Sequence, residues 1–169
     1  MATLLYLARH GETVDNARRV MQGQTPGCLN EQGVEQARQL AGELAGKHFD
    51  AVVASDLRRA VQTARLIADP RGMSVYETPL LRERDWGGFT GRFIDELKDE
   101  VWPDDIETVG MLKDRARRFM QLMRSRYPGQ TVLAVGHGII NKAIQSVYFG
   151  KPMNEIAPMK NAEVRILEL

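Results

Sequence analysis

The sequence has little of what builds disulfide scaffolds, membrane spans or thiolate metal cages. Its 169 residues include one cysteine, Cys28, so no internal disulfide can form and no cluster of thiolates can hold a metal ion. The apolar run near the N-terminus is too short to cross a membrane, and no basic segment precedes it. We therefore expect a cytoplasmic protein with no membrane partner.

An excess of charge of one sign is also missing. The chain has 23 Lys and Arg against 22 Asp and Glu, a formal net charge of +1. No overall field attracts the chain to nucleic acid or anionic lipid, so any bound anion must be held by local arginines. The length and the content of 43% hydrophobic and 27% charged residues predict one globular domain over residues 1–169, and they leave the oligomeric state open.

Short apolar segments alternate with helical segments along the chain. The predicted strands cover residues 3–8, 51–54, 74–76, 131–135 and 164–169. The predicted helices begin after Asn30 and cover residues 57–68, 107–127 and 139–149. This alternation predicts an α/β fold with a mostly parallel central sheet that is covered by helices on both faces.

Chemically active side chains follow four of the predicted strands. In chain order they are Arg9 and His10, Arg58 and Arg59, Glu83, and His137. The carboxyl ends of parallel strands form the ligand-binding edge of such a sheet, so we expect these side chains to meet there.

This set suits phosphoryl transfer. Arginines are permanent cations that bind phosphate, and the helix N-terminus after Gly138 is expected to offer free backbone N–H groups. A neutral histidine nitrogen can attack phosphorus, and a carboxylic acid can protonate the leaving oxygen.

Four motifs carry a family resemblance over nearly the whole chain. They are ARHGETVDN with MQGQTPGCLNEQGVEQA, then SDLRRAVQTA, LRERDWGGFTG and AVGHGI. In this order they resemble the histidine phosphatase superfamily, the phosphoglycerate mutase-like proteins. The resemblance implies a three-layer α/β/α sandwich.

The resemblance also implies a role for each candidate residue. His10 is the phosphorylated nucleophile, Glu83 is the proton donor, and the phosphoryl group is held by Arg9, Arg59 and His137. Contacts to phosphate or substrate are expected from Asn16, Gln22, Gly138 and Arg84.

Some positions depart from the family pattern. Gly136 stands where a serine is common, Ile139 stands where a small residue is common, and residues 24–29 lack the usual acidic residue and the proline before leucine. The segment 86–113 is shorter than the insertion that helps true mutases to enclose their substrate. These departures bear on substrate contacts more than on the chemistry.

The first functional hypothesis is a metal-independent phosphatase for a small phosphomonoester, which acts through a phosphohistidine intermediate and needs no cofactor. One alternative is a phosphoglycerate mutase-type transfer, since Arg84 follows the acid as in the mutase loop. Others are a phosphoprotein or phosphohistidine phosphatase and a non-catalytic module that binds a phosphorylated ligand. Glu83 disfavours the phosphohistidine branch, which generally lacks a glutamate in this loop.

Simpler interpretations apply to several conspicuous residues. We expect Arg58 to face away from the site, His48 to lie in a loop, and Trp86 to pack rather than bind a ligand. Arg115, Arg117 and Arg118 are expected on a solvated helix face, from which one could reach a substrate carboxylate. A zinc site at His10 and His137 would lack a third ligand.

Overall fold

The computed structural model describes all 169 residues. The strands are β1 (Leu4–Arg9), β2 (Ala51–Ser55), β3 (Val75–Thr78), β4 (Thr131–Gly136) and β5 (Val164–Glu168). The helices are α1 (Val14–Arg18), α2 (Glu31–Glu43), α3 (Arg58–Ala68), α4 (Val109–Arg126) and α5 (Gly138–Phe149). The sequence predicted all of these except α1, a five-residue helix capped by Thr13.

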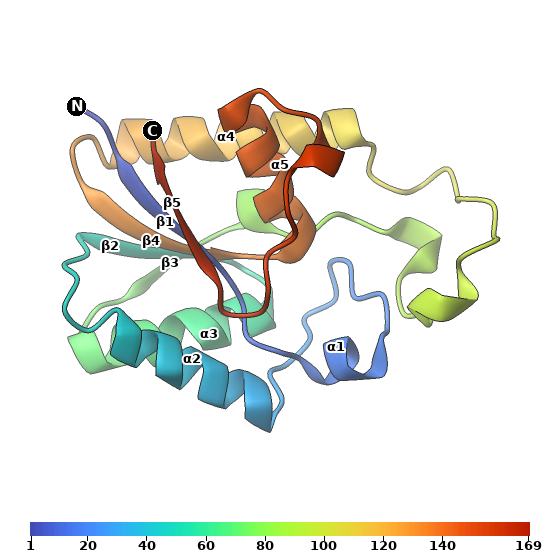
Figure 1. The fold of residues 1–169 in the computed structure, drawn as a ribbon, viewed down its shortest axis with the longest axis horizontal. Helices are drawn as coiled ribbons and strands as arrows, with labels where there is room; N and C mark the ends of the chain where they lie inside the picture. Colours follow the sequence, from blue (N-terminus) through green and yellow to red (C-terminus); the bar gives the residue numbers. More distant parts are fainter.

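The five strands form one sheet in the order β3-β2-β4-β1-β5, and only β5 runs antiparallel to its neighbour. Helices α4 and α5 lie on one face, and α2 and α3 lie on the other (Figure 1). The two chain termini lie close together, and the Thr3 N–H donates to the carbonyl of Leu169 at 3.0 Å. The predicted α/β fold with a mostly parallel central sheet is confirmed.

Successive residues of the strands pack alternately into two hydrophobic cores, one on each face of the sheet. Leu5 and Leu7 of β1 point into the core beneath α4 and α5, while Tyr6 and Ala8 belong to the core beneath α2 and α3. This two-sided burial explains why the strand sequences are continuous apolar runs rather than alternating ones. No helix combines the length and the apolar character that crossing a membrane requires.

The register of the central strands positions the two histidines. Arg9, the last residue of β1, pairs with Gly136, the last residue of β4. The next residue on each strand is a histidine, and the His10 N–H continues the ladder by donating to the Gly136 carbonyl at 3.2 Å. The ends of two neighbouring strands therefore deliver His10 and His137 to the same place.

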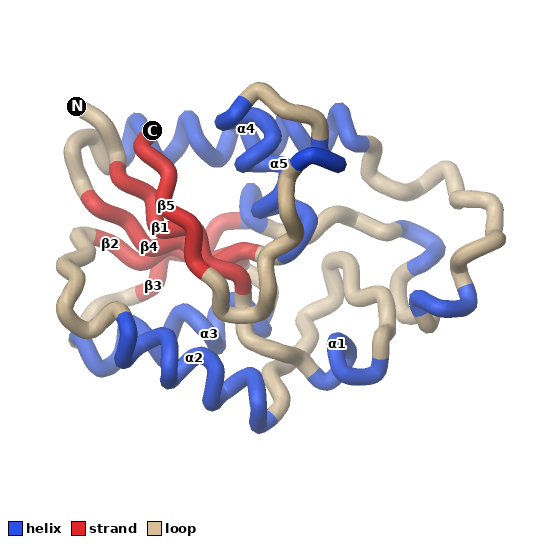
Figure 2. The backbone as a smooth tube through the Cα atoms, in the orientation of Figure 1, coloured by secondary structure: helices blue, strands red, loops and turns tan.

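A long irregular segment follows β3 and extends beyond the sheet edge. It runs from residue 79 to residue 108 and contains only short 3-10 turns (Figures 1 and 2). The carboxyl ends of the strands face this segment and the loop around α1, so the two together wall the region in which a ligand would lie.

Candidate active site

A cavity of about 260 Å³ lies at the carboxyl ends of β1 and β4. Its polar lining comes from six of the predicted residues: Arg9, His10, Asn16, Gln22, Arg59 and Glu83. Segments far apart in the sequence therefore meet in one cavity, as the strand-end argument predicted.

His10 is buried at the floor of this cavity in a defined tautomer. Its Nδ1 lies 2.7 Å from the carbonyl of Gly11. A carbonyl only accepts, so we assign the proton to Nδ1, which leaves the lone pair of Nε2 free. Burial, helped by the positive charge of Arg59, lowers the pKa of His10 to about 3. The ring is therefore neutral near pH 7, which a nitrogen nucleophile requires.

His137 stands beside His10 and is held by Ser55. The two imidazole rings are 5.0 Å apart between centroids, and His137 Nε2 lies 2.8 Å from the Ser55 hydroxyl. The Ser55 hydroxyl also accepts from the Leu57 N–H, and no acceptor other than His137 Nε2 lies within hydrogen-bond distance for its own proton. We therefore assign the imidazole proton to Nδ1, which is buried without a partner. Burial also lowers the pKa of His137, so this ring is a neutral donor.

Two arginines complete the centre. Arg9 donates through Nη1 to the Met159 carbonyl at 2.6 Å, and Arg59 donates through Nη2 to the Gly23 carbonyl at 2.8 Å. Burial lowers the pKa of Arg9, and it lowers the pKa of Arg59 to about 10, so both remain charged near neutral pH. Neither forms a salt bridge with a carboxylate, and Glu83 and other acidic groups act on the two guanidinium charges only from a greater distance.

Three buried N–H donors at this centre have no partner in the protein: Arg9 Nε, Arg59 Nε and His137 Nδ1. A buried donor without an acceptor costs about 1–3 kcal/mol, so such groups are expected to meet a ligand. Two of these donors belong to cations and the third to a neutral histidine, so a suitable ligand is an anion with several acceptor oxygens. A phosphoryl group has this chemistry.

Glu83 lies at the N-terminus of α5. Its carboxylate accepts hydrogen bonds from the backbone N–H groups of Ile139 at 3.1 Å, Ile140 at 3.0 Å and Arg84 at 2.9 Å. The sequence predicted that the first backbone N–H groups of this helix would be free to bind phosphate. This prediction was wrong for Ile139 and Ile140, because their N–H groups donate to Glu83. The N–H of Gly138 is left for that contact, and a side chain at Gly138 would stand 3.3 Å from the Arg9 guanidinium.

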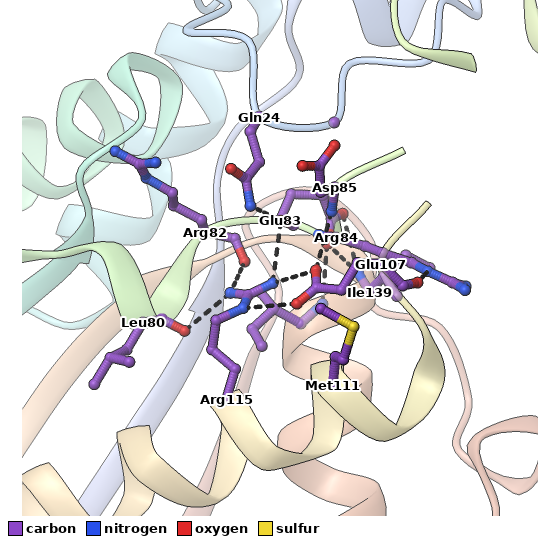
Figure 3. A network of polar contacts seen from close by, with 12 residues as sticks. Gln24, Leu80, Arg82, Glu83, Arg84, Asp85, Glu107, Met111, Arg115 and Ile139 are labelled. Carbon is purple, nitrogen blue, oxygen red and sulfur yellow. Dashed lines mark hydrogen bonds and ion pairs between the residues drawn. The ribbon is translucent and has the colours of Figure 1, made fainter. Parts of the chain in front are cut away.

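Arg115 of α4 anchors the loop that carries Glu83 (Figure 3). Its guanidinium donates to the carbonyls of Leu80 at 3.1 Å, Arg82, and Glu83 at 3.3 Å. It also pairs with the Glu107 carboxylate at 2.8 Å, and both side chains are mostly buried. The prediction that Arg115 faces solvent was therefore wrong, because its guanidinium links α4 to the loop that carries Glu83.

Arg84 and Arg58 both lie outside the cavity. Arg84 donates to the Glu107 carbonyl at 2.8 Å, and its guanidinium lies 4.7 Å from the centre of the Trp86 ring. Arg84 therefore does not line the cavity with the groups around His10, and its contact with phosphate or substrate stays a prediction. Arg58 lines a separate, larger hollow of about 670 Å³ together with other residues of α3, as expected of a residue that faces away from the catalytic cavity.

Asn16, Gln22 and Gly136 are explained by local geometry. Asn16 completes the capping box of α1, and the Gln22 side chain accepts a hydrogen bond from the Thr13 hydroxyl at 3.0 Å. A Cβ atom at Gly136 would come within 2.2 Å of Asn141 Oδ1. The serine common at that position would need Asn141 to move, so glycine fits this chain.

No group of three or more His, Cys, Asp or Glu side chains is arranged to hold a metal ion.

A family model described as histidine phosphatase superfamily (branch 1) matches residues 5–169. A protein of Enterobacter sp. (strain 638) named "Probable phosphoglycerate mutase GpmB" is 36% identical in an alignment of 162 positions, and the match covers 88% of this chain and 75% of that protein.

Solved structures agree with this match. Bacillus stearothermophilus YhfR superposes with a TM-score of 0.90 at 31% identity, over 98% of this chain and 90% of the other. A mycobacterial glucosyl-3-phosphoglycerate phosphatase gives a TM-score of 0.88 at 26% identity, over 99% and 91%. The alpha-ribazole phosphatase of Shigella flexneri gives 0.87 at 26% identity, over 96% and 89%.

Proposed function

The chain belongs to the histidine phosphatase superfamily (branch 1), and on this premise we propose that it hydrolyses a small phosphomonoester through phosphorylation of His10, without a metal ion. The observation that carries the proposal is a neutral His10 with a free Nε2, next to three buried donors that lack partners. Phosphatases and mutases of this superfamily act on small phosphorylated substrates, so the choice between them depends on the rest of the cavity.

The proposed reaction has two displacements at phosphorus. First, His10 Nε2 forms a bond to phosphorus while the bond to the leaving oxygen breaks, and Glu83 gives that oxygen its proton. Arg9, Arg59 and His137 hold the phosphoryl oxygens throughout. A water molecule then attacks the phosphohistidine and gives its proton to Glu83, which releases inorganic phosphate and restores His10.

The cations of the cavity favour hydrolysis over mutase chemistry. A mutase substrate such as phosphoglycerate carries a carboxylate besides its phosphate, and this second anion needs its own positive partner. Arg9 and Arg59 are the two cations that line the cavity, and both face the phosphoryl position. Arg115 is occupied by Glu107 and by backbone carbonyls, and Arg84 lies on Trp86.

A mutase reaction is the second candidate, because curated relatives carry that name. Steady-state assays distinguish the candidates. Purified protein with EDTA should release phosphate from p-nitrophenyl phosphate and from simple alkyl phosphates, and it should not interconvert 3- and 2-phosphoglycerate. The His10→Ala variant is the control for contaminating phosphatase. Isomerisation faster than phosphate release would overturn the proposal, and a lack of all turnover would favour a binding module.

A further inference from the structure

A second, apolar cavity adjoins the catalytic one. It has a volume of about 230 Å³ and is formed by six apolar side chains, Met21, Trp86, Phe89, Ile94, Leu97 and Trp102, together with Lys98. We call it the tryptophan pocket. Met21, Trp86 and Ile94 also line the catalytic cavity, so the two cavities adjoin at these three side chains.

The tryptophan pocket exposes large apolar surfaces although the chain has a complete core elsewhere. Trp102 is 53% exposed and Ile94 is 38% exposed. Exposed apolar groups that cluster beside a reactive centre mark a binding surface more often than scattered ones do. They gain free energy when an apolar ligand displaces water from them.

The aromatic rings of the pocket are fixed before any ligand arrives. Trp102 meets Trp86 edge to face with centroids 5.6 Å apart, and it meets Phe89 in the same manner at 6.0 Å. The Arg84 guanidinium lies 4.7 Å from the Trp86 ring centre and 5.4 Å from that of Trp102. Contacts of this kind hold the indoles in place, so these side chains lose little conformational entropy when a ligand binds.

Charges of both signs surround the pocket, because Lys98 is the one charged side chain in its lining and the Arg84 guanidinium lies over two of its rings. The adjoining segment 94–102 contains four acidic residues and one basic residue, Lys98. Arg19 and Arg92 neutralise two of the acids, through ion pairs to Asp95 and Glu100. Glu96 and Asp99 remain as exposed carboxylates without a partner among the salt bridges.

From this geometry we infer that the substrate is the phosphate ester of an aromatic or extended apolar alcohol, and that its apolar part lies in the tryptophan pocket. The inference rests on the proposed function, because it takes the phosphoryl group to lie at His10. It goes further by naming the chemical class of the leaving group.

The test compares 2-phenylethyl phosphate with ethyl phosphate, whose leaving alkoxides have similar basicity. Burial of a phenyl ring is expected to raise kcat/KM about tenfold or more. In Trp102→Ala this preference should fall at least about threefold. Phe149→Ala is the matched control, because Phe149 is also 53% exposed but lies at the far end of α5. This control should keep the wild-type preference.

Each failure has its own signature. Equal kcat/KM for the two esters in the wild-type protein, or equal losses on both in Trp102→Ala, would overturn the inference while the proposed function stands. A lack of turnover with every ester would reject the proposed function. Calorimetry with 2-phenylethyl phosphate and ethyl phosphate would then test the pocket by itself, since equal affinities would overturn the inference without any catalysis.

Discussion

The Glu83 carboxylate accepts a hydrogen bond from the Ile140 backbone N–H at 3.0 Å, so the residue proposed as the proton donor also caps helix α5. That helix starts directly after His137. The proposed acid and one of the groups that hold the phosphoryl oxygens are therefore fixed to the same helix end. Movement of the loop that carries Glu83 would disturb both.

The role of Glu83 is tested by the leaving group. Glu83→Gln should lower kcat on an alkyl phosphate by about 10²- to 10⁴-fold, because an alkoxide needs the proton. The loss on p-nitrophenyl phosphate should be much smaller, because p-nitrophenolate leaves without help. Equal losses on both substrates would mean that Glu83 only caps the helix, and Asp85 would then be the next residue to test.

Arg115 is expected to act on the reaction through Glu83. Arg115→Ala leaves the Glu107 carboxylate mostly buried without its partner and should lower the free energy of unfolding by about 3 kcal/mol. The loss of activity should be larger on an alkyl phosphate than on p-nitrophenyl phosphate. Urea denaturation and the two assays measure both effects.

Arg117→Ala is the matched control for Arg115. Arg117 lies on the same helix in an exposed pair with Asp114, and such a pair contributes less than about 1 kcal/mol. If Arg115→Ala and Arg117→Ala behave alike, the anchoring role of Arg115 is refuted.

Substitution of the neighbouring residues Arg58 and Arg59 on α3 should have very different effects on kcat/KM. Arg59→Ala should lower kcat/KM by about 10²-fold or more, because a charged contact to the phosphoryl oxygens strengthens in the transition state. Arg58→Ala should have little effect, since Arg58 lines a different hollow. Steady-state kinetics with p-nitrophenyl phosphate measures both effects. Similar losses of kcat/KM in the two variants would contradict this assignment.

The buried His10 predicts a loss of stability in acid. Its pKa is lowered by burial from the ordinary 6.5 to about 3. Between these values the unfolded chain binds a proton that the folded protein excludes. The free energy of unfolding should therefore fall as the pH drops through this window, by up to about 1.4 kcal/mol per pH unit.

Urea denaturation at pH 7.5, 6.0 and 5.0 measures this dependence. His10→Asn removes the group, so its pH dependence should be flatter than that of the wild-type protein. Identical pH dependences would contradict a His10 that is neutral in the fold.

Much of the fold and of the centre could be predicted because local sequence determines them. Continuous apolar runs identified the strands, and the residue after each run is placed at the sheet edge by the chain itself. The Arg9–Gly136 pairing then brings His10 and His137 together. The family resemblance supplied the roles of these residues, which the strand pattern does not contain.

The parts that were missed depend on contacts distant in sequence. Ser55 stands in the quoted SDLRRAVQTA motif, but nothing in the sequence indicates that its hydroxyl meets His137, 82 residues further on. Arg115 resembles its exposed neighbours until α4 is packed against residues 80–83. Arg84 directly follows Glu83 in the chain, yet its guanidinium lies over the two indole rings and does not line the catalytic cavity.

The most direct test of the account is the detection of phosphate on His10. The wild-type protein, quenched during turnover of a phosphomonoester and analysed by mass spectrometry under alkaline conditions, should carry one acid-labile phosphoryl group on the peptide that contains His10. Glu83→Gln should form the same adduct with p-nitrophenyl phosphate, and His10→Ala should form none. Turnover with no adduct on His10, or a phosphoenzyme that persists in His10→Ala, would contradict the account.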